Sequence, residues 1–162
     1  DEIVTSARRL FVDHGYDETS LSRIAADAGV TTNTVYWYFA DKDHLLVAVL
    51  EGLLAEAMSR YEPIASRPLG DKIMFAVDEL SAMRNLVDTV HSRRSVSPVI
   101  DQWHDTFHGV ADALTRGDLP PENAEAASHI IAFVVEGLLT HPGDDVERRA
   151  IVDLLVDRIA AH

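Results

Sequence analysis

Hydrophobic residues recur along this chain at the three- and four-residue spacing of amphipathic helices, and no segment shows the strict alternation of a half-buried strand. The first stripe ends at His14-Gly15, a typical helix C-cap. A second short helix is expected to start at Ser20, a good N-cap residue, and to end at Gly29. A third is expected from Thr31 or Thr32 to about Phe39. The pattern therefore predicts three short helices in the N-terminal part of the chain.

Longer amphipathic segments follow. Asp41 is expected to begin a long helix that Pro63 stops, and the next helix carries the stripe of residues 73–83. A break is expected after it, before the segment NLVDTVHSRR. Pro98 opens another helix that Gly117 ends, and two apolar helices complete the chain. The pattern gives about eight or nine helices in all, which predicts an all-α fold.

The composition is that of an ordinary globular protein. The 162 residues are 47% hydrophobic and 25% charged, which is enough chain to bury a sizeable core. No apolar run approaches the roughly 20 residues of a membrane span, and the absence of cysteine excludes disulfides and thiolate metal sites. We therefore expect a cytoplasmic protein with no membrane contact. Because the chain begins at Asp1 rather than at methionine, we expect its natural start to lie upstream.

A net charge of −13 opposes nucleic-acid binding unless the charge is unevenly placed. Residues 1–44 hold four basic and eight acidic side chains, and residues 45–162 hold ten and nineteen. The stretch 28–40, however, contains no acidic residue. This stretch is the part of the chain best suited to approach a polyanion.

The same stretch carries the signs of a helix-turn-helix motif. A glycine between two short helices permits the positive φ of a tight turn, and Ala25 is small enough for the helices to cross closely. The second helix is then the recognition helix, and its first turn carries short hydroxyl and amide side chains suited to base edges and phosphates. That turn consists of Thr31, Thr32, Asn33 and Thr34.

Four consecutive aromatic residues, Tyr36 to Phe39, come shortly after this turn. Tyr36 and Phe39 are three residues apart and share a helix face, so Phe39 is expected to pack inward beneath Tyr36. Trp37 and Tyr38 lie on other faces, where an indole N–H or a phenol can reach a phosphate oxygen. Lys42 follows as a point charge near the DNA backbone.

The segment TSLSRIAADAGVTTNTVYWYFADKDHLL resembles the helix-turn-helix signature of TetR-type transcriptional repressors. That signature combines a hydroxyl pair, Ile-Ala, Ala-Gly-Val, Thr-apolar-Tyr, a Phe, and a Lys three residues before a Leu. The positions that fit are Thr19, Ser20, Ile24, Ala25, Ala28, Gly29, Val30, Thr34, Val35, Tyr36, Phe39, Lys42 and Leu45. Residues 46–162 resemble the family only in being helical and in ending with two long apolar helices.

The resemblance implies a DNA-binding domain at 1–44 and a ligand-binding and dimerisation domain at 45–162. By this analogy Ser20, Thr34, Tyr36, Tyr38 and Lys42 hold phosphates, while Thr31, Thr32, Asn33, Ser22 and Arg23 sit toward bases. Tyr38 replaces a histidine that many members carry. The family usually has a basic arm ahead of its first helix, and the printed sequence does not include one, which would weaken its hold on phosphates.

The resemblance also implies a homodimer on a near-palindromic DNA operator, released by a small-molecule effector. The dimer face is expected on the last two helices, at Ile131, Val134, Val135, Leu138, Leu154 and Leu155. Large apolar side chains on the middle helices predict a site for a mostly apolar effector, with one polar contact from a histidine. These residues are Met74, Phe75, Met83, Trp103, His104, Phe107 and Phe133.

An alternative places a metal at His104 and His108, which share a helix face at i and i+4 near Asp101 or Asp105. The sequence lacks the glutamate that a zincin helix uses as general base, and it shows no phosphate loop or nucleophile elbow. We therefore expect no enzyme, no cofactor and no metal. The pair Arg93-Arg94 is interpreted as a helix-end pair rather than as a basic patch.

Overall fold

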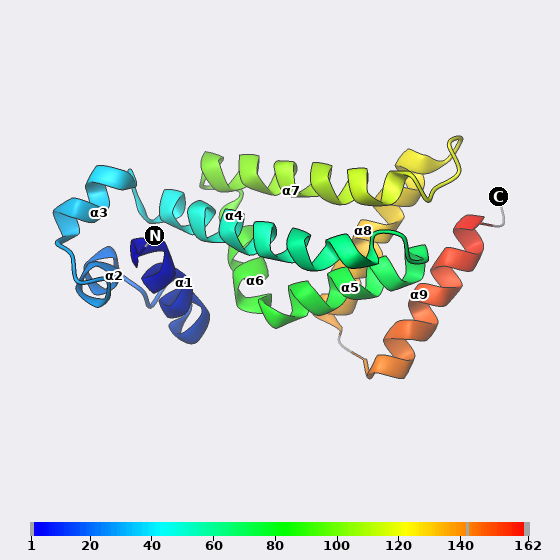
Figure 1. Ribbon diagram of the computed structural model, residues 1–162, viewed down its shortest axis with the longest axis horizontal. Helices are drawn as coiled ribbons and strands as arrows, with labels where there is room; N and C mark the ends of the chain where they lie inside the picture. Colours follow the sequence, from blue (N-terminus) through cyan, green and yellow to red (C-terminus); the bar gives the residue numbers. More distant parts are fainter. Residues whose placement is uncertain (1, 142, 161–162) are drawn as a thin grey trace. The chain divides into compact units, whose positions relative to one another are not determined.

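The computed structural model describes residues 2–141 and 143–160, and Figure 1 follows the chain through them from α1 to α9. Every regular element in these residues is a helix, which confirms the predicted all-α class. None of the helices described is long and apolar enough to cross a membrane.

Two compact units make up the chain. The first unit runs from α1 to Ala57 and includes Met83–Thr106, so it draws on two separate parts of the sequence. Its helices are α1 (Glu2–His14), α2 (Leu21–Asp27), α3 (Thr32–Tyr38), most of α4 (Lys42–Tyr61), α6 (Arg84–Arg93) and the first part of α7 (Pro98–Arg116).

The second unit comprises Met58–Ala82 and the chain from Phe107 onward. It holds the end of α4, a 3-10 turn at Glu62–Ile64, α5 (Leu69–Ala82), the rest of α7, α8 (Ala124–Thr140) and α9 (Asp145–Ala160). Because α4 and α7 each continue through both units, the packing units do not coincide with the sequence division at residue 44. That functional division stays a prediction.

The first unit is built around one buried cluster. The stripe of α1 contributes Ala7 and Phe11, each with no exposed surface, and α4 contributes Leu45 and Leu46. The side of α6 and α7 that faces this cluster contributes further buried residues, among them Leu86 and Ile100. The buried residues recur at three- and four-residue spacing along these helices, as expected for amphipathic helices around a shared core.

Local capping sets the ends of the helix-turn-helix as predicted. The Ser20 side chain accepts a hydrogen bond from the Arg23 backbone N–H at 3.2 Å, and Thr31 accepts one from the Thr34 N–H at 3.2 Å. Between the helices Gly29 adopts φ +69°, and the Val30 N–H donates to the Ala25 carbonyl at 2.9 Å. Caps and turn thus fix the angle between α2 and α3.

The longer helices also begin and end close to the predicted residues. The Asp41 carboxylate accepts from the His44 backbone N–H at 2.9 Å, which caps α4, and α4 ends two residues before Pro63. The predicted break separates α5 from α6 at Met83, and α7 runs from Pro98 to the residue before Gly117. The one clear shift is α5, which begins at Leu69 rather than near residue 73.

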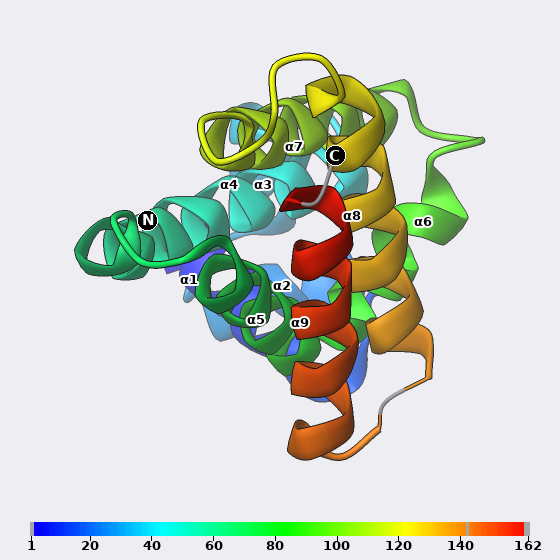
Figure 2. The same ribbon diagram turned by 90° about the vertical axis from the view of Figure 1, so that its right-hand side faces the viewer.

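In the second unit, α5 packs on both α8 and α9, and α8 and α9 lie side by side (Figure 2). Gly70 of α5 lies next to α9, because a Cβ added to it would be in ordinary van der Waals contact with Asp153 at 3.6 Å and with Val152 at 3.8 Å. Lys72 is 8% exposed and its ammonium donates to Asp118 at 2.7 Å. A paired lysine is thus part of this unit's interior.

The turn at Gly29 provides a test of the fold. Gly29→Ala should lower the free energy of unfolding by about 1–2 kcal/mol, because an L-residue is strained at positive φ. Gly52→Ala is the matched control, since Gly52 is exposed in α4 and a methyl group added to it would meet nothing within 4 Å. That change should raise stability by about 0.5–1 kcal/mol. Urea denaturation at one protein concentration measures both, and equal effects of the same sign would contradict the account of the turn.

Candidate nucleic-acid interface

The recognition helix α3 buries one face and leaves its aromatic side chains in solvent. Val35 has no exposed surface, whereas Tyr36, Trp37 and Tyr38 are 55%, 80% and 62% exposed. The Trp37 and Tyr38 rings meet edge to face with centroids 4.9 Å apart. Large aromatic groups without cover on a short polar helix are typical of a binding surface.

The first turn of α3 is partly occupied by its own caps. The hydroxyls of Thr31 and Thr34 lie 2.9 Å apart, in addition to the cap bond between them. Thr32 is half-buried and Asn33 is exposed. Asn33 is therefore the side chain of this turn that is most open to a base edge, as its amide pattern suggests.

The start of α2 presents a second polar surface. The Ser20 and Ser22 hydroxyls lie 2.9 Å apart, and both residues are exposed. Arg23 is exposed on the same helix and forms no ion pair within the part of the chain that the structure describes. These three residues place two hydroxyls and a cation at a helix N-terminus, where anions are favoured.

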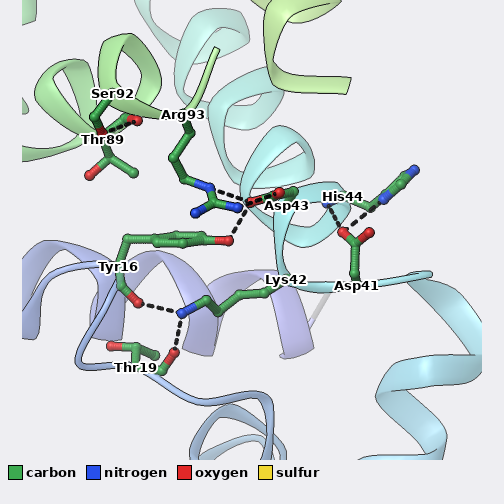
Figure 3. Close-up of polar contacts among 9 residues, drawn as sticks. All are labelled: Tyr16, Thr19, Asp41, Lys42, Asp43, His44, Thr89, Ser92 and Arg93. Atoms are coloured by element: carbon green, nitrogen blue, oxygen red, sulfur yellow. Dashed lines mark hydrogen bonds and ion pairs between the residues drawn. The ribbon is translucent and has the colours of Figure 1, made fainter. Parts of the chain in front are cut away.

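Lys42, predicted to hold a phosphate, is engaged inside the protein. Its Nζ donates to the backbone carbonyls of Tyr16 at 2.8 Å and of Thr19 at 3.0 Å, as Figure 3 shows. An ammonium has three N–H donors, so at most one is left for DNA. Burial lowers the pKa of Lys42 from its usual value. The role that the structure assigns to Lys42 is to hold the turn between α1 and α2.

The neighbouring Asp43 is bound on two sides. Arg93 contacts it with Nε at 2.7 Å and Nη2 at 2.7 Å, and the Tyr16 hydroxyl donates to the same carboxylate. Burial opposes the ionisation of Asp43, but the hydrogen bonds from Arg93 and Tyr16 outweigh it and hold the pKa of this carboxyl below its usual range. Burial and the bond to Asp43 raise the pKa of Tyr16. Asp43 therefore stays charged in a mostly enclosed position.

Other cations of the first unit are paired as well. Arg8 contacts Glu56, with Nη2 and Oε2 3.0 Å apart, and Arg9 contacts Asp27. The chain therefore presents few unpaired cations near α2 and α3. This leaves hydroxyls, amides and backbone N–H groups as the main partners for phosphates.

The residues predicted for the effector site divide between the two units. Met83, Trp103 and His104 belong to the first, and Met74, Phe75, Phe107 and Phe133 to the second. All are at least half-buried except Phe133, which is 71% exposed on α8. Phe133 therefore points outward from its own unit instead of lining an enclosed site.

The predicted dimer residues also fall on two faces of α8. Ile131, Val135 and Leu138 are 7%, 8% and 5% exposed, so they belong to the interior of their own chain. The exposed apolar residues of α8 are Ile130 and Phe133, on the opposite face. The difference arises because α8 is apolar nearly all round, and periodicity then cannot show which face meets α5 and α9.

The two histidines of the alternative metal site have different neighbours. His104 Nε2 lies 3.4 Å from Arg94 Nη1, and His108 Nε2 lies 4.0 Å from a carboxylate oxygen of Glu136. A guanidinium beside an imidazole nitrogen opposes a metal cation there. Over the described ranges 2–141 and 143–160, no three His, Cys, Asp or Glu side chains are grouped to hold a metal ion. The geometry does not favour a metal centre.

Three residues of this region were not predicted from the sequence as functional: Tyr16, Asp43 and Arg93. Their contacts span 27 and 50 residues of the chain, so no local motif joins them. The sequence offered only one hint of this cluster, namely that Lys42 and Asp43 are adjacent at the expected start of a helix.

Comparison with known proteins agrees with this geometry. Residues 3–49 match the bacterial regulatory proteins of the tetR family. The chain is 30% identical over 163 residues to the HTH-type transcriptional regulator TtgR of Pseudomonas putida, covering 85% of this chain and 77% of TtgR. It is 27% identical over 165 residues to the HTH-type transcriptional repressor BepR of Brucella suis biovar 1, covering 86% and 78%.

The fold is shared with a solved structure. The regulator FadR from Bacillus subtilis, in complex with stearoyl-CoA, superposes with a TM-score of 0.65 at 17% identity, covering 98% of this chain and 96% of that one. The helix-turn-helix signature, the exposed recognition helix and the length of the match to TtgR lead to one conclusion. The chain belongs to the TetR family of DNA-binding transcriptional regulators.

Proposed function

We propose that this regulator is a homodimeric repressor that binds a near-palindromic operator and is released from it by a small, mostly apolar effector. The observation that carries the proposal is the outward face of α3, where Tyr36, Trp37 and Tyr38 are exposed while Val35 beneath them is fully buried. Repression is supported by the likeness to BepR, which is named a repressor.

The polar groups around α3 suit a major groove. Thr32 and Asn33 would face base edges, and Arg23 would sit beside them from α2. The hydroxyls of Ser20, Ser22, Thr31 and Thr34, with the tips of Tyr36, Trp37 and Tyr38, would reach phosphates on either side. Two such helices on successive major grooves stand about 34–36 Å apart, which requires a near-palindromic operator.

A second copy of the chain is proposed to cover an exposed apolar face on α8 and α9. Ile130 and Phe133 on α8 are 46% and 71% exposed, and Ile151 and Leu154 on α9 are 39% and 59% exposed. Val134 and Leu155, both half-buried, adjoin this face. Exposed large apolar side chains gathered on two helices mark an interaction surface, and the same face on both copies satisfies twofold symmetry.

The effector is proposed to contact the large apolar side chains that the sequence pattern singles out, with His104 supplying a polar contact. Met and aromatic side chains adapt to apolar molecules of varied shape. The bound stearoyl-CoA of FadR, a protein of the same fold, combines a long apolar chain with a polar group and supports this chemical class. The candidates are Met74, Phe75, Met83, Trp103, His104 and Phe107.

No catalytic role is proposed. TtgR is named a transcriptional regulator and BepR a transcriptional repressor, and the proposed regulator would act in the cytoplasm. The effector experiment below also tests for metal binding at His104 and His108.

Asn33→Ala should change which bases are preferred. Loss of an amide at a base edge should cost about 1–3 kcal/mol at the contacted base pair. The measurement is selection of duplexes from a random library by the wild type, followed by titration of the variant against the selected duplex and single-base changes in it. Random duplex serves as the control, and an equal loss on selected and random DNA would remove the base-reading role of Asn33.

Phe133→Glu should produce monomers, because the added charge would be buried between two copies. Ala113→Glu is the control, since Ala113 is exposed and lies on α7, a helix that is not part of the proposed face. Sedimentation at micromolar concentration should show the first variant as a monomer and the second as a dimer. A dimeric Phe133→Glu protein would show that the copies meet elsewhere.

An apolar effector should quench Trp103 and weaken operator binding together. Because Trp37 is the other tryptophan, the titration uses Trp37→Phe protein, with a long-chain acyl compound and a highly charged metabolite as probes. The acyl compound should quench the fluorescence, and His104→Ala should weaken that response. A response to divalent metal alone, abolished by a chelator, would favour the histidine site instead.

A further inference from the structure

The ring of Tyr16 lies between two cations inside the first unit. Lys42 Nζ is 3.9 Å from the ring centroid and Arg93 Cζ is 4.8 Å from it. Figure 3 shows the two side chains approaching the ring from opposite sides. Tyr16 is only 5% exposed, so both cations act on a ring that water barely reaches.

Asp43 makes this arrangement possible. Two cations that flank one ring repel each other, and a carboxylate bound to one of them offsets that repulsion. Arg93 holds Asp43 through two parallel bonds of 2.7 Å, and the Tyr16 hydroxyl donates to the same carboxylate. Asp43 is thereby satisfied without Lys42, although the two are neighbours in sequence.

Lys42 is therefore available to the turn between α1 and α2. Its ammonium donates to the carbonyls of Tyr16 and Thr19. The Thr19 hydroxyl in turn donates to the Gly15 carbonyl at 2.8 Å, and Ser20 begins α2 at the next residue. The position of this turn consequently sets where α2, and with it α3, stands on α4.

Loss of the contact from Arg93 would redistribute these bonds. Asp43 would be left as an enclosed carboxylate without its strongest partner, and its side chain is only 14% exposed. Such a charge is costly unless another cation replaces the lost one. Lys42 is the cation already beside it, but moving Lys42 to Asp43 would remove both of its bonds to the turn.

We propose that Arg93 is a positioning residue for DNA binding: by holding Asp43, it keeps Lys42 on the α1–α2 turn and so keeps the helix-turn-helix in its DNA-binding arrangement. Arg93 is the last residue of α6, so a displacement of that helix end would release the turn. The proposal rests on the proposed function as an operator-binding repressor.

Arg94 provides a matched control. It is the next residue, it carries the same charge, and its Nε contacts Asp101 of α7 at 2.9 Å rather than the start of α4. Full-chain Arg93→Gln should bind the duplex selected by the wild type about tenfold or more weakly. Arg94→Gln should bind within about twofold of the wild type. Equal losses would show a general effect of charge or stability and would overturn the proposal.

Two further measurements separate positioning from a direct contact. Arg93 does not reach DNA in this account, so Arg93→Gln should keep the salt dependence of binding, whereas loss of a phosphate contact would lower the slope by about one. Asp43→Asn and Arg93→Gln should each weaken binding, and the double variant should be no weaker than the worse single variant. A lowered slope or additive losses would contradict the proposed route.

Lys42 itself can be observed, because the chain has only two lysines, Lys42 and Lys72. In protein labelled with ¹³C at lysine Cε, Lys72→Arg assigns the two signals. Arg93→Gln should raise the pKa of Lys42, since a nearby positive charge is removed and Asp43 becomes its partner. Arg94→Gln should not change it, and an unchanged pKa in Arg93→Gln would show that Lys42 does not move.

The outcomes also distinguish this proposal from the proposed function. A wild type that selects no duplex from the random library would overturn the proposed function and this inference with it. A wild type that selects a duplex, with Arg93→Gln binding as tightly, would overturn the positioning role alone. If Arg93→Gln fails to fold, Arg93→Lys keeps the charge with fewer contacts, and it should lose affinity without losing helicity.

Discussion

Lys42 holds the turn between α1 and α2 through two backbone carbonyls, and the arrangement of the DNA-binding helices depends on that contact. The turn leads directly to the Ser20 cap, the cap begins α2, and the positive φ of Gly29 then sets the direction of α3. Each step is local, and two side-chain contacts hold the turn as a whole on α4. The Lys42 ammonium bonds two carbonyls of the turn, and the Tyr16 hydroxyl donates to Asp43 at the start of α4.

A net charge of −13 is a second constraint on how this protein can bind DNA. Arg8, Arg9 and Lys42 are committed to internal partners, so the surface around α3 has little positive charge to offer a phosphate. The groups that remain to bind phosphates are helix N-termini, hydroxyls and amides, which act only at short range. Binding of this kind depends on geometry more than on attraction from a distance. A small displacement of α3 should therefore matter more here than in a strongly basic protein.

The parts of this structure that sequence could predict are those set by neighbours along the chain. Ser20, Thr31 and Gly29 act within a few residues of their own position, and the expected caps and turn are confirmed. The contacts of Lys42 lie 23 and 26 residues away, and the pair of Asp43 with Arg93 spans 50. Helical phase likewise showed that α8 is apolar but not which face α5 would cover, so Phe133 was placed inward although it is 71% exposed. Such pairings depend on tertiary packing, which no local pattern encodes.

The free energy of the Arg93–Asp43 contact relates the proposed dimer to the proposed positioning role of Arg93. Moving a two-state equilibrium from 99:1 to 1:99 requires about 5.5 kcal/mol. Hydrogen bonds to charged groups contribute roughly 1.5–3 kcal/mol each in net terms, so the two Arg93–Asp43 bonds of one copy together contribute about 3–6 kcal/mol, which is close to that requirement. In the proposed dimer both copies would contribute, because both recognition helices would have to fit the operator together. Gly137 weakens α8 by about 1 kcal/mol relative to alanine, and among the described residues outside its own helix backbone a Cβ added to it would meet nothing within 4 Å. A glycine on the exposed apolar face of α8 has a physical reason if a helix of a second copy approaches there. The same approach would bring a second Arg93–Asp43 contact into the regulator that binds the operator.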